Sequence, residues 1–181
     1  MVYLFLANGF EEIEALTPVD VLRRGKAEIK TVGMGGKTVT GSHGITVTAD
    51  IASSELGDMS DMEAVILPGG MPGTLNLEAS PEVKNAVKVC AERGGIVGAI
   101  CAAPSILGHM GLLNGRRATA FPGFEKELEG AEFKNDFVSV DGNFITARGM
   151  GVSLEFDLAL LRAIKGDEAA DHVKNSVQCR L

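Results

Sequence analysis

Tryptophan is absent from this 181-residue chain, tyrosine occurs once, and aromatic residues make up only 5% of the sequence. Basic side chains are also few, because 17 lysines and arginines stand against 24 acidic residues and leave a formal net charge of −7. Proteins that bind nucleic acids normally present basic patches, and those that bind single strands also present aromatic stacking platforms. The composition therefore argues against a nucleic-acid partner.

Cysteine is scarce as well, and the three residues Cys90, Cys101 and Cys179 lie far apart. They form no C-x-x-C pair and no histidine–cysteine cluster at the spacing of zinc ligands, so the sequence predicts no metal site. An odd number of isolated cysteines indicates reduced thiols and a cytoplasmic location. We expect Cys90 to face the core from its helix, as a small apolar residue, and Cys179 to be a thiol of the tail.

Long apolar runs are missing, since none approaches the roughly 18 residues that a membrane span requires. The apolar segment 1–7 has no basic leader and is too short for a signal peptide. The sequence also shows no internal repeat, low-complexity segment or linker. We therefore expect one domain over residues 1–181 with no membrane contact, which buries about two-thirds of the surface of the unfolded chain.

Short apolar runs alternate with amphipathic segments, which predicts an α/β fold with a mostly parallel central sheet and helices on both faces. The predicted strands are 2–7, 29–32, 64–67, 96–100 and 117–120, with strand pairs at 37–40/45–48 and 137–140/144–147. The predicted helices are 11–24, 81–93, 104–110, 152–165 and 167–178. Because Pro18 lies inside the first helix, we expect a kink there or a restart with Thr17 as the cap.

A glycine-rich segment at 33–38, GMGGKT, has the composition of a nucleotide-binding loop without its spacing. Thr31 stands where a phosphate-binding loop requires a glycine, and Thr38 stands where the dinucleotide fingerprint requires its third glycine. No helix follows to offer its N-terminus to a phosphate. We predict a simple turn and no nucleotide cofactor.

Cys101 ends the most apolar predicted strand and stands at the start of a helix. Its side chain is expected at the carboxyl edge of the sheet, where open α/β folds bind ligands. Backbone N–H groups at a helix start stabilise a thiolate, so a reactive Cys101 with a lowered pKa is one interpretation. The other interpretation is a small apolar residue that fills a tight corner between strand and helix.

None of the three histidines is placed to activate this thiol. His109 lies on the same predicted helix, about 12 Å further along its axis. His43 falls in a hairpin turn and His172 on the last helix, and both are expected at the surface. The sequence therefore predicts no cysteine–histidine pair.

Acidic residues follow the first strand, at Glu11, Glu12 and Glu14. Favourable interaction with the helix dipole explains Glu11 and Glu12. Glu14 differs, because helical spacing places it on the face that contacts the sheet. A carboxyl group held there would have a raised pKa and would be suited to donate or accept a proton.

Two glycine-containing segments lie at further predicted strand ends. Gly69 and Gly70 follow a central strand, where their backbone N–H groups can form an oxyanion hole or simply a tight turn. Arg148 and Gly149 precede a helix, where they can bind an anion or simply begin that helix.

Taken in order, these segments resemble the DJ-one/ThiJ/PfpI superfamily across nearly the whole chain. The resemblance rests on five motifs: GFEEIEA at 9–15, PVDVLRR at 18–24, LPGG at 67–70, AICAAP at 99–104 and RGMG at 148–151. It implies a flavodoxin-like three-layer sandwich that forms a homodimer. The superfamily's reactive cysteine matches Cys101, its partner carboxyl Glu14, and its backbone donors Gly69, Gly70 and Ala102.

The resemblance further implies cofactor-free action on methylglyoxal, glyoxal or glycated amines and thiols, as a glyoxalase or deglycase. The alternative function in the superfamily is a non-catalytic oxidative-stress sensor or chaperone with an oxidisable cysteine. One departure bears on this choice. Many members have a histidine before a proline where this chain has Phe121 and Pro122, and a bacterial branch with Phe-Pro looks closer. Since phenylalanine transfers no protons, Glu14 would carry all of the proton transfer.

Overall fold

The computed structural model describes residues 1–180, and Leu181, the last residue of the expected single domain, lies outside the described residues. A seven-stranded sheet forms the middle layer, in the order β10-β11-β7-β6-β1-β2-β5. The three central strands are β1 (Val2–Leu6), β6 (Ala64–Leu67) and β7 (Ile96–Ile100). Their residues are almost all buried because helices cover both faces, and parallel pairing joins the three strands.

The outer strands complete the sheet on either side. They are β2 (Ile29–Gly33) and β5 (Ile51–Ala52) on one side, and β11 (Phe144–Ala147) and β10 (Val138–Asp141) on the other. Only the β10–β11 pair is antiparallel among the strand pairs described for this sheet. The predicted α/β sandwich with a mostly parallel sheet is confirmed.

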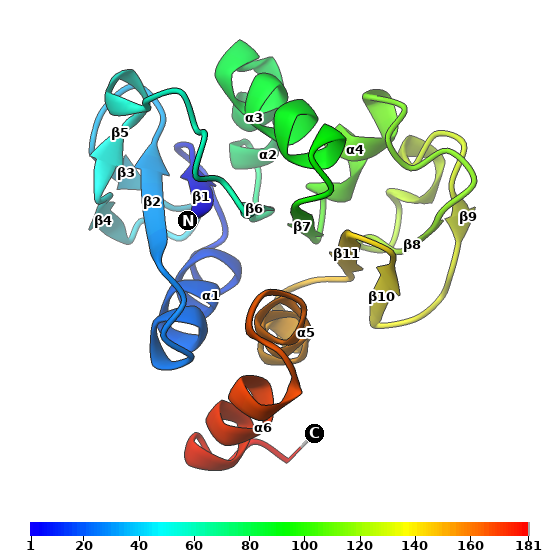
Figure 1. Cartoon of the computed structure of the whole chain (residues 1–181). Helices are drawn as coiled ribbons and strands as arrows, with labels where there is room; N and C mark the ends of the chain where they lie inside the picture. The colour runs from blue at the N-terminus through cyan, green and yellow to red at the C-terminus, as the bar shows by residue number, and fades with distance from the viewer. Residues whose placement is uncertain (181) are drawn as a thin grey trace.

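Helices form the two outer layers (Figure 1). One face carries α1 (Glu12–Arg24) and α5 (Ser153–Lys165), with α6 (Asp167–Ser176) packed against α5. The opposite face carries α2 (Gly73–Ala79), α3 (Pro81–Glu92) and α4 (Pro104–His109). Alternate residues of β1 point to different cores: Leu4 packs with the first group and Phe5 with the second.

Smaller elements lie beyond the main sheet. Strands β3 (Thr38–Thr40) and β4 (Thr46–Thr48) form the predicted antiparallel hairpin. Strands β8 (Arg117–Ala118) and β9 (Glu132–Phe133) pair beside β10. The remaining elements are three short 3-10 helices at Ser53–Glu55, Glu125–Glu127 and Met150–Val152. Within residues 1–180, no helix combines the length and apolarity needed to cross a membrane.

Two local details differ from the sequence-based expectations. Helix α1 does not restart at Thr17, because it continues through Pro18 and is capped by Glu11. Pro18 is buried, and the packing of α1 against the sheet and α5 outweighs one missing backbone hydrogen bond. Helix α2 was not predicted, since its seven residues directly follow a turn rich in proline and glycine.

Candidate active site

Cys101 follows β7 directly, at the carboxyl edge of the sheet as predicted. Its backbone is held on both sides, since its N–H donates to Ala147 O at 2.9 Å and its carbonyl accepts from Phe121 N at 2.8 Å. These bonds keep Cys101 at φ +65°, a left-handed conformation that a non-glycine residue adopts at a cost. Strained residues of this kind concentrate at functional sites, which favours the reactive interpretation of Cys101 over the packing one.

Glu14 reaches the same point from α1. Its side chain is buried, with 1% of the residue exposed, and its Oε2 accepts a hydrogen bond from Gly69 N at 3.0 Å. The pKa of Glu14 is raised to about 7, mainly by burial and also by the charge of Glu11. Hydrogen bonds with Cys101, Gly69 and Met150 act in the opposite direction and lower this pKa. The expectation of a buried carboxyl group with a raised pKa is confirmed.

The expected lowered pKa of Cys101 is wrong in direction. Burial first, and then the charge of Glu14 and a hydrogen bond to it, together raise the pKa of the Cys101 thiol to about 12. Backbone N–H groups of Ala102 and Gly70 face the sulfur and lower the pKa, but they are outweighed. The helix contributes little, because α4 begins only at Pro104 and has six residues. Cys101 and Glu14 form a hydrogen-bonded unit that we call the thiol–carboxyl pair.

Gly69 lies between the members of this pair. A Cβ atom at Gly69 would lie 2.6 Å from Cys101 Cβ and 2.7 Å from Glu14 Oε2, so only glycine fits without displacing one of them. Its N–H is already donated to Glu14. Gly69 was expected to be an oxyanion donor, but its N–H group is engaged and instead positions the carboxyl group. Gly70 and Ala102 do direct their N–H groups to the sulfur.

The segment after β11 forms the other side of the site. A Cβ atom at Gly149 would lie 3.2 Å from Phe121 Cδ2 and 3.7 Å from Glu14 Oε1, so the aromatic ring and the carboxyl group both approach Gly149 where a side chain would project. The Arg148 guanidinium stands over the Phe137 ring, 5.5 Å from its centroid. Beside the thiol–carboxyl pair, a groove of about 400 Å³ runs along this segment. It is lined by Phe121, Pro122, Phe137 and residues 148–152.

The histidines lie outside this site. His109 contacts Glu78 through Nδ1 at 2.5 Å and Glu127 through Nε2 at 2.9 Å, so both ring nitrogens are engaged. His172 is exposed on α6. Cys90 is fully buried, as predicted, and Cys179 is half-buried against the core instead of lying free in the tail.

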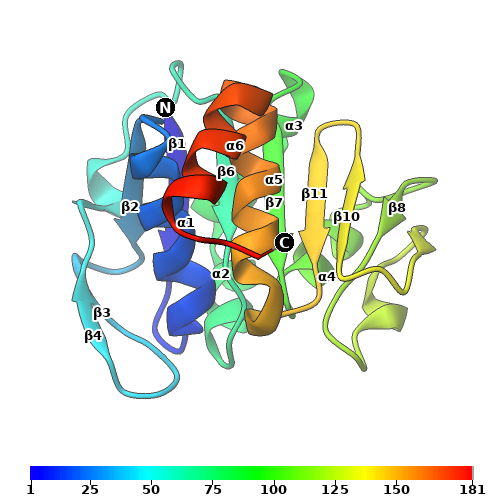
Figure 2. The ribbon, with the colours of Figure 1, turned by 90° about the horizontal axis from the view of Figure 1, so that it is seen from below.

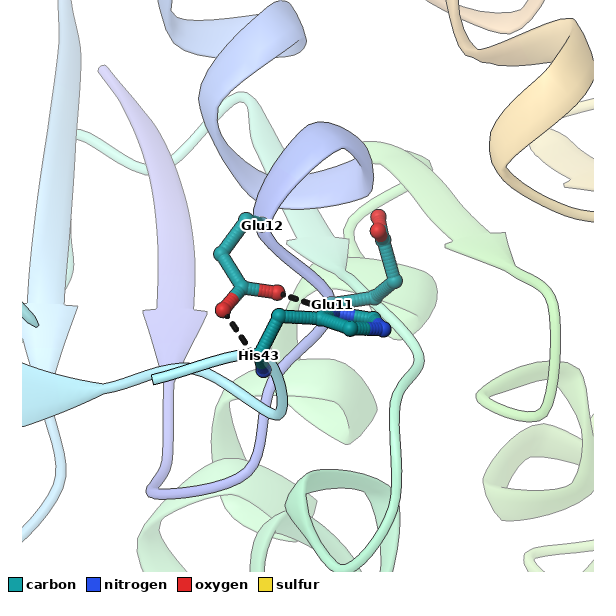
Figure 3. A group of neighbouring side chains, drawn as sticks. All are labelled: Glu11, Glu12 and His43. Atoms are coloured by element: carbon teal, nitrogen blue, oxygen red, sulfur yellow. Dashed lines mark hydrogen bonds and ion pairs between the residues drawn. The ribbon is translucent and has the colours of Figure 1, made fainter. Parts of the chain in front are cut away.

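Glu12 has a larger structural role than the helix dipole predicts. It is buried and binds the β3–β4 turn, accepting hydrogen bonds from His43 N at 2.8 Å and His43 Nδ1 at 2.9 Å (Figure 3). Although burial raises the pKa of Glu12, these bonds lower it to about 2. The ligand atoms of Glu11, Glu12 and His43 lie within 4.8 Å of one another, which is close enough for a metal ion. Glu12 and His43 are, however, already hydrogen-bonded to each other. The sequence did not reveal this contact, because it joins residues 31 positions apart.

A parallel α/β sandwich whose central strand ends in a strained cysteine beside a buried glutamate defines a class of cysteine-centred α/β proteins. The model of one such family, the DJ-1/PfpI family, matches residues 1–163. The chain belongs to this family.

Curated relatives share this similarity. The chain is 37% identical over 175 residues to the Parkinson disease protein 7 homolog of Danio rerio, covering 94% of this chain and 93% of the relative. It is 30% identical over 159 residues to a glutathione-independent glyoxalase of Caenorhabditis elegans, covering 87% and 84%. It is 33% identical over 153 residues to a deglycase of Pyrococcus abyssi, covering 83% and 90%. The chain spans only 45% of the Arabidopsis thaliana protein DJ-1 homolog A, to which it is 36% identical.

Solved structures show the same fold. The oxidized DJ-1 of Toxoplasma gondii superimposes with a TM-score of 0.94 at 29% identity, covering 99% of this chain and 98% of that one. A C103A mutant of a DJ-1 superfamily protein from Salmonella typhimurium gives a TM-score of 0.91 at 32% identity, covering 98% and 97%.

Proposed function

We propose that this protein, acting as one domain, converts small reactive carbonyls into hydroxy acids, with Cys101 as nucleophile and Glu14 as the proton-transferring group. The substrates are methylglyoxal and glyoxal, or their early adducts on amines and thiols. The observation that carries the proposal is the thiol–carboxyl pair, in which a half-buried sulfur contacts a carboxyl group whose pKa is about 7. Relatives named glyoxalase and deglycase support the substrate class.

The raised pKa of Cys101 determines how the sulfur becomes a nucleophile. At neutral pH a substantial fraction of Glu14 is ionised and can accept the thiol proton while the sulfur attacks the aldehyde carbon. The new C–S bond gives a hemithioacetal whose oxygen carries the developing negative charge. The N–H groups of Gly70 and Ala102 face the sulfur that is bonded to this carbon, and we assign the stabilisation of the charge to them.

The remaining steps are an internal redox reaction followed by hydrolysis. Glu14 moves the proton of the former aldehyde carbon to the neighbouring carbonyl carbon through an enediol, which leaves a hydroxyacyl thioester on Cys101. Water cleaves the C–S bond, releases the hydroxy acid and returns the proton to the sulfur. The aldehyde carbon is oxidised and its neighbour is reduced, so the reaction consumes one water molecule and needs no external oxidant, reductant or cofactor.

Arg148 and Gly149 complete the proposed site. Gly149 allows its backbone to lie against Glu14, and the Arg148 cation lies in the adjacent groove, where it attracts the carboxylate of the product. Both residues were expected to contact an anion or substrate.

Purified protein is expected to convert methylglyoxal to lactate, measured by loss of the dicarbonyl and by chiral analysis of the acid. Cys101→Ser and Glu14→Gln are each expected to lower kcat/KM at least 100-fold. Cys90→Ser provides the matched control, because that thiol is buried away from the site. Full activity in the Cys101→Ser variant would overturn the proposal.

We also propose that the protein acts as a cytoplasmic homodimer. Ile13 and Leu16 are 47% and 38% exposed on α1, next to the site, and form an apolar surface that a second copy can cover. All three cysteines are free thiols, as a reducing compartment requires. Sedimentation equilibrium is expected to give a dimer that Ile13→Glu converts to a monomer, and a monomeric wild type would contradict the assembly.

A further inference from the structure

The groove beside the thiol–carboxyl pair is much larger than methylglyoxal requires. Its volume of about 400 Å³ lies within the range of roughly 300–1,000 Å³ for sites that bind drug-sized ligands. The segment 148–152, which joins β11 to α5 (Figure 2), forms one wall. The proposed mechanism uses Arg148 and Gly149 of this wall and leaves the apolar part of the groove unexplained.

The groove adjoins the thiol–carboxyl pair through two of its lining residues, Phe121 and Gly149. The Phe121 ring and Glu14 Oε1 both lie beside Gly149, and Phe121 N donates a hydrogen bond to the carbonyl of Cys101. A bulky substituent on a carbonyl compound attached to the sulfur can therefore extend past Phe121 toward the groove.

The chemistry of the walls is aromatic and cationic. Phe121, Phe137 and Met150 are 47%, 61% and 52% exposed, which is unusual for large apolar side chains grouped in one groove. The Arg148 guanidinium lies among them, over the Phe137 ring. A thioether, two aromatic rings and a guanidinium each interact favourably with another aromatic ring.

We infer that the preferred substrates are aromatic 2-oxoaldehydes, with the aryl group in the groove between Phe121, Phe137 and Met150. This inference rests on the proposed function, because the aldehyde carbon must still reach Cys101. The reaction is unchanged: the arylglyoxal and one water molecule give the 2-hydroxy-2-arylacetate, with the aldehyde carbon oxidised and the ketone carbon reduced. Phenylglyoxal would thus give mandelate, whose carboxylate Arg148 attracts.

The test compares kcat/KM for phenylglyoxal, cyclohexylglyoxal and methylglyoxal. We expect phenylglyoxal to exceed methylglyoxal by about tenfold or more, and to exceed cyclohexylglyoxal as well. Phe121→Ala and Phe137→Ala are each expected to lower the phenylglyoxal-to-methylglyoxal ratio about tenfold. Phe133→Ala is the matched control, since Phe133 is 37% exposed on β9 outside the groove, and it should leave the ratio unchanged.

Equal use of the three substrates, or equal use of phenylglyoxal and cyclohexylglyoxal, would overturn the aromatic preference while leaving the proposed function intact. If wild type turned over none of the three substrates, this result would instead refute the proposed function. In that case calorimetry decides the inference: wild type should bind mandelate but not lactate, and Phe121→Ala should lose the mandelate signal. Equal binding of the two acids, or none, would overturn it.

Discussion

Asp157 provides a stability prediction whose size follows from its surroundings. This α5 residue is 0% exposed, and neither carboxyl oxygen has a hydrogen-bond partner among the described residues. Burial raises the pKa of Asp157 well above its ordinary value of 3.8, so the folded protein keeps this carboxyl protonated. The unfolded chain releases that proton above about pH 4.

The sign of the pH dependence follows from this difference. Because the folded state binds the proton more tightly, rising pH favours the unfolded state by about 1.4 kcal/mol per pH unit between the ordinary and the raised pKa. Asp157→Asn keeps the shape and removes the titration. Its free energy of unfolding, relative to wild type, is expected to increase by about 1.4 kcal/mol between pH 4.5 and pH 5.5.

Urea unfolding at several pH values measures this directly, with far-ultraviolet circular dichroism as the probe. Glu155→Gln on the same helix is the matched control, because Glu155 is half-exposed and should follow the wild-type pH dependence. Parallel curves for wild type and Asp157→Asn would refute the reasoning, since they would mean that Asp157 is ionised in the folded protein.

Two further predictions concern the edges of the proposed site. Glu12→Ala should lower the free energy of unfolding by about 1–3 kcal/mol near pH 7, because it removes the buried acceptor of two bonds from His43. The pKa of Glu12 is lowered to about 2, so its contribution should disappear as pH falls from about 4.5 toward 2, and it should weaken as pH rises through the raised pKa of His43. Urea unfolding that shows no loss at low pH would contradict the contact. Gly69→Ala should lower kcat/KM for methylglyoxal about 100-fold, because the added Cβ displaces the thiol–carboxyl pair. Gly57→Ala, with nothing within 4 Å of the added Cβ, is its control, and equal kcat/KM in the two variants would count against that geometry.

The sequence predicted the architecture and the two central site residues well. Short continuous apolar runs located the central strands, which are buried on both faces, and Cys101 follows β7 as expected. Helical spacing alone placed Glu14 toward the sheet, and the carboxyl edge of a parallel sheet then brings the two residues together. These predictions succeeded because each depends on local periodicity and on one rule of topology.

Properties that depend on exact three-dimensional surroundings were not predicted. The pKa of Cys101 is set by burial and by the charge of Glu14, 87 positions earlier, and not by a helix terminus. The groove combines Phe121, Phe137 and Met150 from three separate segments, of which only the one with Met150 belongs to the five motifs. Asp157 is an acidic residue on the buried face of α5, and only the packing around it reveals that its carboxyl group has no partner among the described residues.

The central claim is that Cys101 reacts by passing its proton to Glu14. The most direct measurement is the rate of Cys101 alkylation by iodoacetamide against pH, in a Cys90→Ser/Cys179→Ser background with and without Glu14→Gln. We predict a rate that rises with an apparent pKa near 7, which Glu14→Gln abolishes. A profile that follows an ordinary thiol, with a pKa near 9 in both proteins, would contradict the account.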